Sequence, residues 1–207
     1  MSRPSAMVYL VRHAHASDKA TWHDVDLHRP LSPQGEREAA GLVIRLDDLP
    51  IDRVLSSPAL RCEQTVRPVA QRRRLAIEHS GMLGVGADAA KIAAFIGDAA
   101  DRAVLCTHGE VLADLFPILL AGGLVVAEPL VWPKGATWIL HRTGTGPFRA
   151  RFLPPLAWPT AWGLAEDDLG LVAGPRSASL RRRRRQTAGR AARDRRGDRD
   201  VRHAGGR

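Results

Sequence analysis

Arginine, histidine and serine side chains follow three short apolar segments of this chain, each of which leads into a segment of helical character. The three segments are residues 10–14, 55–61 and 105–110. Short apolar runs rich in β-branched residues are typical of buried strands. Because α/β proteins bind ligands at the edge where the carboxyl ends of parallel strands meet, we expect the polar groups of the three segments to converge there. These groups are Arg12, His13, Arg61 and His108.

The four side chains have the chemistry that phosphoryl transfer requires. Guanidinium groups present forked donors that match phosphoryl oxygens. A helix that begins at Gly109 would add backbone N–H donors and a favourable dipole. One imidazole can attack phosphorus while the other donates to the phosphoryl oxygens. The pattern therefore predicts phosphoryl transfer without a metal ion or another cofactor.

Strands and helices are expected to alternate along the chain. Strands are predicted at 7–12, 51–56, 75–79, 103–107, 137–141 and 148–153, and helices at 33–47, 58–74, 89–96 and 111–120. A Thr-Gly-Thr-Gly sequence at 143–146 predicts that the last two strands form a hairpin. This alternation is typical of an α/β fold, a three-layer α/β/α sandwich with a mostly parallel central sheet.

The helix at 33–47 has a clear beginning. Ser32 is the predicted N-cap, Pro33 the first helical residue, and Glu36 lies near the capping-box position. Its apolar face is predicted from the 3.6-residue period to comprise Ala39, Ala40, Val43, Ile44 and Leu46.

Positive charge is concentrated at the C-terminal end. Residues 175–207 contain 13 Arg and 3 Asp, and the whole chain has a formal net charge of +9. The run of arginines at 181–185 has no large apolar partner, which is typical of disorder. We therefore predict a folded domain over 1–174, with its core at about 6–153, and a disordered Arg-rich tail over 175–207. An alternative role for that tail is weak, nonspecific contact with nucleic acid.

The remaining composition favours a cytoplasmic protein that does not enter a membrane. The two cysteines, Cys62 and Cys106, are too few for a disulfide framework, and no Cys/His spacing suggests zinc. Residues 1–7 lack the apolar core of a signal peptide. The longest apolar run contains Pro117 and is too short to span a bilayer.

Taken together, the three segments resemble the signature of the histidine phosphatase superfamily, which has the phosphoglycerate-mutase-like fold. Arg12-His13-Ala14 stands where the family has Arg-His-Gly, and the alanine variant resembles the SixA-type phosphohistidine phosphatases. A closer likeness is to the phosphatase half of bacterial proteins that fuse a Nudix domain to this fold, although we find no Nudix segment here. The resemblance covers about residues 6–153.

The resemblance implies a role for each member of the motif. His13 would be the nucleophile that carries a phosphohistidine intermediate. Arg12 and Arg61 would hold the phosphoryl oxygens, and His108 would complete the phosphate site and take part in catalysis.

The proton donor to the leaving group is less well defined. In the family a carboxylate often follows the third strand, but residues 80–87 contain none. Glu110 is the catalytic candidate, Asp18 and Asp24 are alternatives, and a further alternative is that no acid is present. A general acid contributes about 10²–10⁴-fold when the leaving group is poor. Its absence would favour phosphoramidate or phosphoanhydride substrates, whose leaving groups need less help.

Three further residues are candidate substrate contacts, and two of them also have a structural alternative. They are Ser17, Arg29 and Ser57. Ser57 precedes a proline and could instead cap a helix, and Arg29 could instead pair with Asp24 or Asp26.

The sequence thus predicts a metal-independent phosphatase that acts on phosphohistidine or on nucleoside di- or polyphosphates. Its partner would be a phosphorylated small molecule or a phosphohistidine protein. An alternative within the fold is a broad phosphomonoesterase or a phosphomutase. The alternative from another class is a nucleic-acid-associated protein that acts through its Arg-rich tail.

Overall fold

Seven strands form a single sheet in a computed structural model that describes residues 5–98 and 100–156. In order across the sheet they are β3 (Ile77–His79), β2 (Arg53–Ser56), β4 (Ala103–Thr107), β1 (Ala6–Arg12), β6 (Thr137–Arg142), β7 (Arg149–Leu153) and β5 (Val125–Val126). The four α-helices of the described part are α1 (Pro33–Leu46), α2 (Leu60–Arg73), α3 (Ala89–Asp98) and α4 (Gly109–Ala121). The predicted α/β fold with its mostly parallel sheet is confirmed.

The pairing of the strands brings the three motif segments to one edge. Strands β1, β4, β2 and β3 run parallel, so that Arg12 lies beside Thr107 and Ser56 beside Cys106. β6 is antiparallel to both β1 and β7, and the predicted hairpin is present as β6–β7. β4 lies between β1 and β2, and the carboxyl ends of all three therefore open onto the same side of the molecule.

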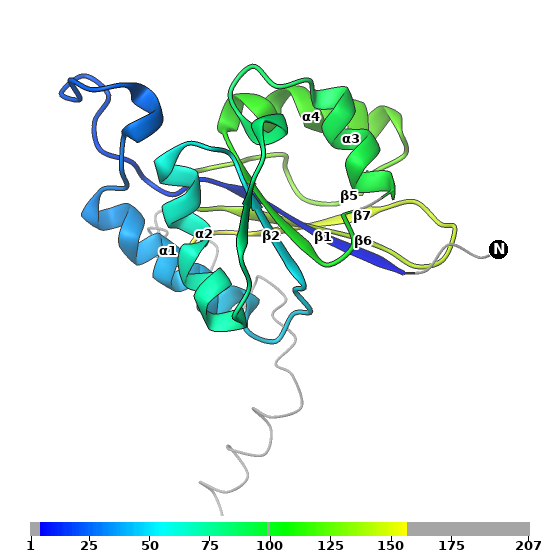
Figure 1. Cartoon of the computed structure of the whole chain (residues 1–207). Helices are drawn as coiled ribbons and strands as arrows, with labels where there is room; N and C mark the ends of the chain where they lie inside the picture. Colours follow the sequence, from blue (N-terminus) through cyan, green and yellow to red (C-terminus); the bar gives the residue numbers. More distant parts are fainter. Residues whose placement is uncertain (1–4, 99, 157–207) are drawn as a thin grey trace, which may run out of the picture. The chain divides into compact units, whose positions relative to one another are not determined.

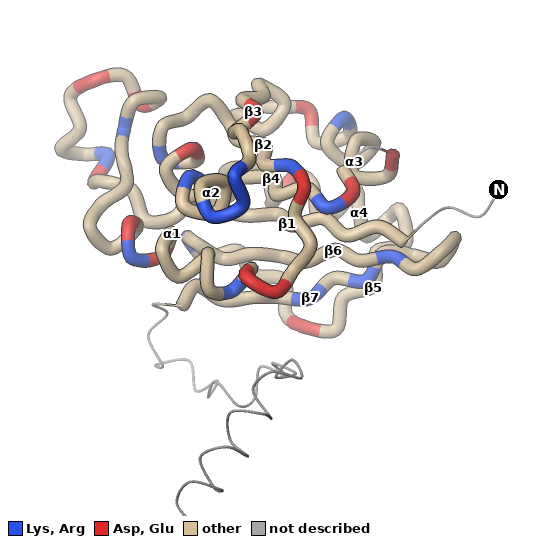
Figure 2. Tube along the Cα trace, turned by 60° about the horizontal axis from the view of Figure 1, so that its bottom comes forward, with Lys and Arg blue, Asp and Glu red and all other residues tan. Residues whose placement is uncertain are grey.

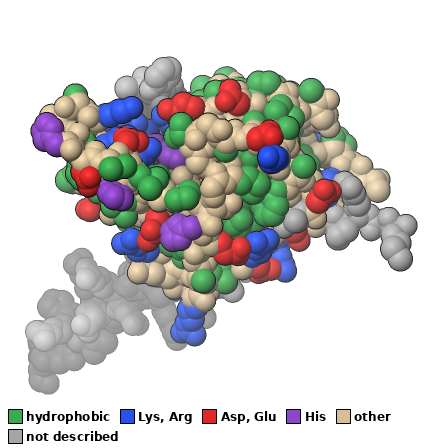
Figure 3. Space-filling view, turned by 45° about the horizontal axis from the view of Figure 1, so that its top comes forward, with side chains coloured by type: hydrophobic (Ala, Val, Ile, Leu, Met, Phe, Trp, Pro, Cys, Tyr) green, Lys and Arg blue, Asp and Glu red, His purple; other side chains and the backbone are tan. Residues whose placement is uncertain are grey.

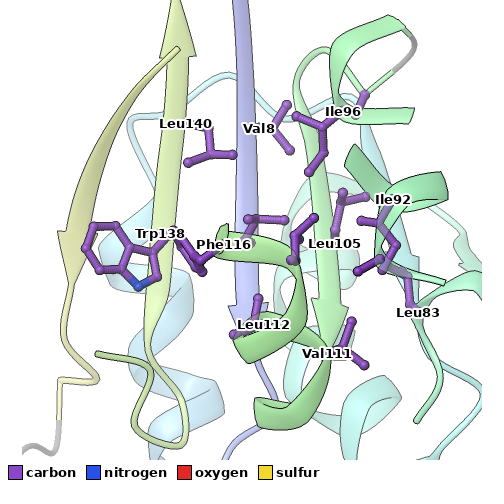
Figure 4. Close-up of a cluster of buried hydrophobic side chains, with 14 of the residues drawn as sticks. Val8, Leu83, Ile92, Ile96, Leu105, Val111, Leu112, Phe116, Trp138 and Leu140 are labelled. Carbon is purple, nitrogen blue, oxygen red and sulfur yellow. The ribbon is translucent and has the colours of Figure 1, made fainter. Parts of the chain in front are cut away.

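Helices cover both faces of the sheet, with α1 and α2 on one face and α3 and α4 on the other (Figure 1). The alternation of side chains along β1 supplies both cores. Val8 and Leu10 pack with residues of α3 and α4, whereas Tyr9 and Val11 pack with residues of α1 and α2. Figure 4 shows the first of these cores, where side chains of β1, β4 and β6 meet those of α3 and α4. The motif segments are thus anchored in strands that are buried on both faces.

Every predicted strand and helix is present, with its ends within two residues of the prediction. The predicted face of α1 is partly wrong. Ala40 and Ile44 are exposed, Ile44 by 67%, whereas Glu38 is only 4% exposed. The helix is rotated from the expected face because Glu38 points inward, where its Oε2 accepts a hydrogen bond from the His15 amide at 2.8 Å.

The loop between β1 and α1 lies close against the start of α1. The Ser32 amide donates to the His15 carbonyl at 2.9 Å, and the Ser32 hydroxyl caps α1 by accepting from the Gly35 amide at 3.2 Å. A Cβ at Gly35 would overlap the His15 carbonyl oxygen, so this close approach requires glycine. Acidic and basic residues both occur along this loop, which lies at the left of the view in Figure 2.

All described residues belong to the compact unit Met1–Trp158. The predicted Arg-rich tail over 175–207 lies outside the described residues. Of the helices in the described part, none has the length and apolar character needed to cross a bilayer.

Candidate active site

The structure brings Arg12, His13, Arg61 and His108 together at the carboxyl edge of the sheet, and we call these residues the Arg–His cluster. The rings of His13 and His108 meet edge to face, with their centroids 5.3 Å apart. Arg61 lies in the first turn of α2, and its Nη2 is 3.4 Å from Nδ1 of His108. The three residues are 6%, 2% and 4% exposed. Both imidazoles and the Arg61 guanidinium are therefore close together and largely shielded from water, whereas Arg12 is half-buried.

His13 is held in one tautomer. Its Nδ1 lies 2.8 Å from the Ala14 carbonyl oxygen, which can only accept, so Nδ1 carries the hydrogen and Nε2 carries the lone pair. The pKa of His13 is lowered to about 3, mainly by burial and also by electrostatic interaction with His108, Arg61 and Arg12, while the hydrogen bond to the Ala14 carbonyl acts in the opposite direction. The imidazole is therefore neutral at physiological pH, with a free nitrogen able to act as a nucleophile.

Arg12 is fixed by its surroundings on two sides. Its Nη1 donates to the Trp132 carbonyl oxygen at 2.7 Å. On the other side its guanidinium lies against the first residue of α4, where a Cβ at Gly109 would be 2.8 Å from Cζ. Burial lowers the pKa of Arg12, and Glu110 opposes this effect. Its Nε is buried with no hydrogen-bond partner among the described residues, so it offers a donor to a bound anion.

Arg61 is engaged by Asp26 from the loop between β1 and α1. Its Nη1 donates to the Asp26 carbonyl oxygen at 2.7 Å, and its Nη2 to Oδ2 of the same residue at 3.0 Å. Oδ1 of Asp26 accepts from Nε of Arg29 at 2.8 Å. The hydrogen bond from Arg29 lowers the pKa of Asp26, with a further contribution from Arg61. Asp26 is thus a carboxylate that joins two arginines.

His108 is the N-cap of α4, and Ser57 orients its ring. The Ser57 hydroxyl lies 2.9 Å from Nε2 of His108 and accepts from the Ala59 amide at 3.3 Å. The Ser57 side chain is 1% exposed. Ala59, and not Ser57, is the N-cap of α2, and the partner of the Ser57 hydroxyl in the site is His108, so a contact of Ser57 with substrate stays a prediction. Sγ of Cys62 lies 3.6 Å from the same Nε2.

The other candidate residues lie around the cluster with different partners. Arg29 pairs with Asp26 and donates to the Ser17 carbonyl at 2.7 Å, so Ser17 takes part through its backbone. Asp24 pairs with His28 at 3.2 Å. The pKa of Asp24 is lowered, first by the hydrogen bond from the Val25 amide and then by the hydrogen bond with His28. Glu110 and Asp18 are exposed.

Several residues around the cluster were not singled out from the sequence. Thr65 accepts from the Ala14 amide at 2.9 Å and donates to the Arg61 carbonyl at 2.6 Å, so it joins α2 to the end of β1. Its spacing of four residues from Arg61 places both on one face of α2, which is the signal that could have found it. The predicted alternative of an Arg29–Asp26 pair is present, but the contact of Asp26 with Arg61 and the position of Lys134 carry no comparable signal.

Within residues 5–98 and 100–156, no group of three or more His, Cys, Asp or Glu side chains is arranged to hold a metal ion. The buried donors of the cluster instead belong to cationic or neutral groups, which favour an anion with several oxygens.

A family model described as the histidine phosphatase superfamily (branch 1) matches residues 8–83. The match includes Arg12, His13 and Arg61, the first three members of the cluster along the chain. Residues 8–83 belong to the histidine phosphatase superfamily. The predicted family is confirmed over these residues. His108 lies beyond the matched residues, and the fold places it beside His13.

Solved structures of SixA proteins share the fold of this chain. A SixA phosphohistidine phosphatase from Nakamurella multipartitia is 22% identical with a TM-score of 0.57, covering 76% of this chain and 100% of that one. The protein histidine phosphatase SixA complexed with tungstate is 23% identical with a TM-score of 0.56, covering 72% and 97%.

A curated relative of the domain is the 8-oxo-(d)GTP phosphatase of Mycolicibacterium smegmatis. The two are 29% identical over 154 residues, which is 72% of this chain and 48% of the relative. The chain therefore spans about half the length of this relative.

Proposed function

We propose that this domain is a metal-independent phosphatase that forms a phosphohistidine intermediate on His13. Phosphohistidine and nucleoside di- or polyphosphates are its proposed substrate class. The observation that carries the proposal is the state of His13: a neutral ring whose Nδ1–H donates to the Ala14 carbonyl, leaving the Nε2 lone pair free among three cationic or imidazole neighbours.

The proposed reaction has two displacements at phosphorus. Nε2 of His13 forms a bond to phosphorus while the bond from phosphorus to the leaving group breaks, and the leaving group keeps the electron pair. Arg12 and Arg61 hold the phosphoryl oxygens, and His108 donates to one of them. Water then attacks the phosphohistidine, the N–P bond breaks, and the products are inorganic phosphate and neutral His13.

The positions of the carboxylates support the proposed substrate class. Asp26, the carboxylate in contact with the cluster, bonds two arginines, and its lowered pKa keeps it ionised. Asp24 is held by His28, and Asp18 and Glu110 are exposed. This arrangement suits a substrate whose leaving group needs no strong acid, and imidazole and phosphate are leaving groups of that kind. The name of the mycobacterial relative supports a nucleotide, and those of the SixA neighbours support phosphohistidine.

Turnover of three substrate types tests this proposal. We expect hydrolysis of a phosphohistidine peptide or of a nucleoside diphosphate in the presence of EDTA, and much slower hydrolysis of an alkyl phosphate monoester. Loss of turnover in EDTA that added metal restores would overturn metal independence. Rapid turnover of alkyl phosphates alone would overturn the substrate class and favour the broad phosphomonoesterase or phosphomutase.

We propose the domain boundary at residue 174 and a cytoplasmic location, where the two free thiols would stay reduced. On the face shown in Figure 3, acidic and basic side chains are interspersed, which does not favour nucleic acid as the partner of that face. If the Arg-rich tail is the functional part, truncation after residue 174 abolishes function while His13→Ala does not. We expect the reverse.

A further inference from the structure

Lys134 lies beside the Arg–His cluster and has no part in the reaction proposed above. It belongs to the loop that leads into β6. The Trp132 carbonyl accepts from Nη1 of Arg12 at 2.7 Å, the Gly135 amide donates to the His13 carbonyl at 3.2 Å, and the Ala136 carbonyl accepts from the Arg12 amide at 3.0 Å. Lys134 is therefore flanked on both sides by residues that bond directly to the catalytic dipeptide.

The loop around Lys134 is fixed on its other side as well. Gly135 has a φ of +76°, and a Cβ there would be 3.1 Å from Oε2 of Glu38. Glu38 is buried, with one oxygen on the His15 amide and the other on Nε2 of Gln34, both at 2.8 Å. The backbone at Lys134 is thus held between α1 and the end of β1, and its position relative to the cluster is defined.

The charge around Lys134 is predominantly positive. Lys134 is half-buried, and burial lowers its pKa, followed by the positive charges of Arg12 and Arg29; Glu38 and Asp18 act in the opposite direction. In the part of the chain that the structure describes, Lys134 has no ion-pair partner. Arg29 is anchored by Asp26 and the Ser17 carbonyl. Arg12 and Arg29 are thus near enough to act on the charge of Lys134, and a ligand with more than one anionic group would neutralise these cations.

We propose that Lys134 and Arg29 form a subsite for the second phosphoryl group of an oligophosphate substrate, whose terminal phosphoryl group lies at Arg12, Arg61 and His13. This inference rests on the proposed function and selects the nucleoside di- or triphosphate from its substrate class. As Nε2 of His13 bonds to the terminal phosphorus, the bond from that phosphorus to the bridging oxygen breaks. The leaving phosphate keeps the electron pair, and Lys134 stabilises the charge that develops there without transferring a proton.

The test compares the binding of imidodiphosphate, a non-hydrolysable diphosphate, with that of inorganic phosphate. Lys134→Met removes the charge and retains most of the side-chain length. We expect the ratio of the two affinities to fall about tenfold, because a bond to a charged group is lost only by the diphosphate. Lys134→Arg restores most of the ratio. Lys91→Met is the matched control, since the Lys91 side chain is exposed on α3 and pairs with Asp88 at 3.8 Å; it leaves the ratio unchanged.

An equal loss of affinity for both anions in Lys134→Met, or no loss for either, overturns the subsite. So does a variant that loses turnover of a phosphohistidine peptide while it retains that of a nucleoside diphosphate. These binding measurements need no turnover and are separate from the proposed function. That function fails if wild-type protein hydrolyses neither substrate, whatever the outcome with imidodiphosphate.

Discussion

Replacement of Gly109 by alanine tests whether Arg12 acts from the position seen in the structure. The new Cβ would be 2.8 Å from Cζ and Nε of Arg12 and 2.9 Å from Nη2. Ordinary contacts begin at 3.4 Å, so the guanidinium must retreat by at least about 0.6 Å. Its Nη1 is bonded to the Trp132 carbonyl at 2.7 Å, and this bond opposes the retreat. Displacement of a catalytic group on this scale costs about tenfold to hundredfold in rate.

We expect Gly109→Ala to lower kcat/KM for a nucleoside diphosphate by that factor while the melting temperature does not fall. The protein should remain folded because the displaced atoms are the end of a flexible side chain and because alanine favours a helix over glycine by about 1 kcal/mol. Gly97→Ala in α3 is the matched control, since a Cβ there meets nothing within 4 Å. Full activity in Gly109→Ala would refute the reasoning, as would an equal loss in Gly97→Ala.

Three further predictions concern the residues around the nucleophile. The pKa of His13 is about 3 in the folded protein and about 6.5 in the unfolded protein. Between these two pH values the unfolded state binds more protons, so the protein loses stability as the pH falls below about 6.5. Between about pH 6.5 and pH 5, the free energy of unfolding measured in urea should therefore fall by about 2 kcal/mol less in His13→Asn than in wild type. An identical fall in both proteins would contradict a neutral buried ring. Asp26→Asn removes a negative charge from Arg61, so phosphate should inhibit the variant at a several-fold lower concentration, and a higher inhibition constant would show that Asp26 assists anion binding. Ser57→Ala leaves His108 without its partner at 2.9 Å and should destabilise the protein by about 1–3 kcal/mol in the same assay, whereas Ser57→Thr should retain most of the stability.

The sequence predicts the edge of the sheet well because hydrophobic patterning places the strands. Apolar runs end at Arg12 and at Thr107, and a parallel register then puts these ends side by side. Residues 143–146 likewise mark a hairpin through local turn chemistry. These features depend on contacts between neighbours in the sequence and on the regular geometry of sheets, so no detailed knowledge of packing is needed to predict them.

The remaining features depend on contacts between distant segments. Glu38 turns inward because the backbone at His15 needs an acceptor, and no periodicity in α1 reveals this need. Asp26 lies 35 positions from Arg61 in the sequence, yet bonds it through both backbone and side chain. Lys134 reaches the cluster only because its loop bonds to the end of β1. Such pairings follow from how the loops fold back over the sheet.

Detection of phosphate on His13 tests the central claim most directly. The protein is mixed with a nucleoside diphosphate labelled in its terminal phosphate, or with a phosphohistidine peptide, and the reaction is quenched with alkali within milliseconds. We predict label that is stable in base, is lost in acid, maps to His13 by mass spectrometry and is absent from His13→Asn. Turnover without labelled histidine, or label that persists in the His13→Asn variant, would contradict the account.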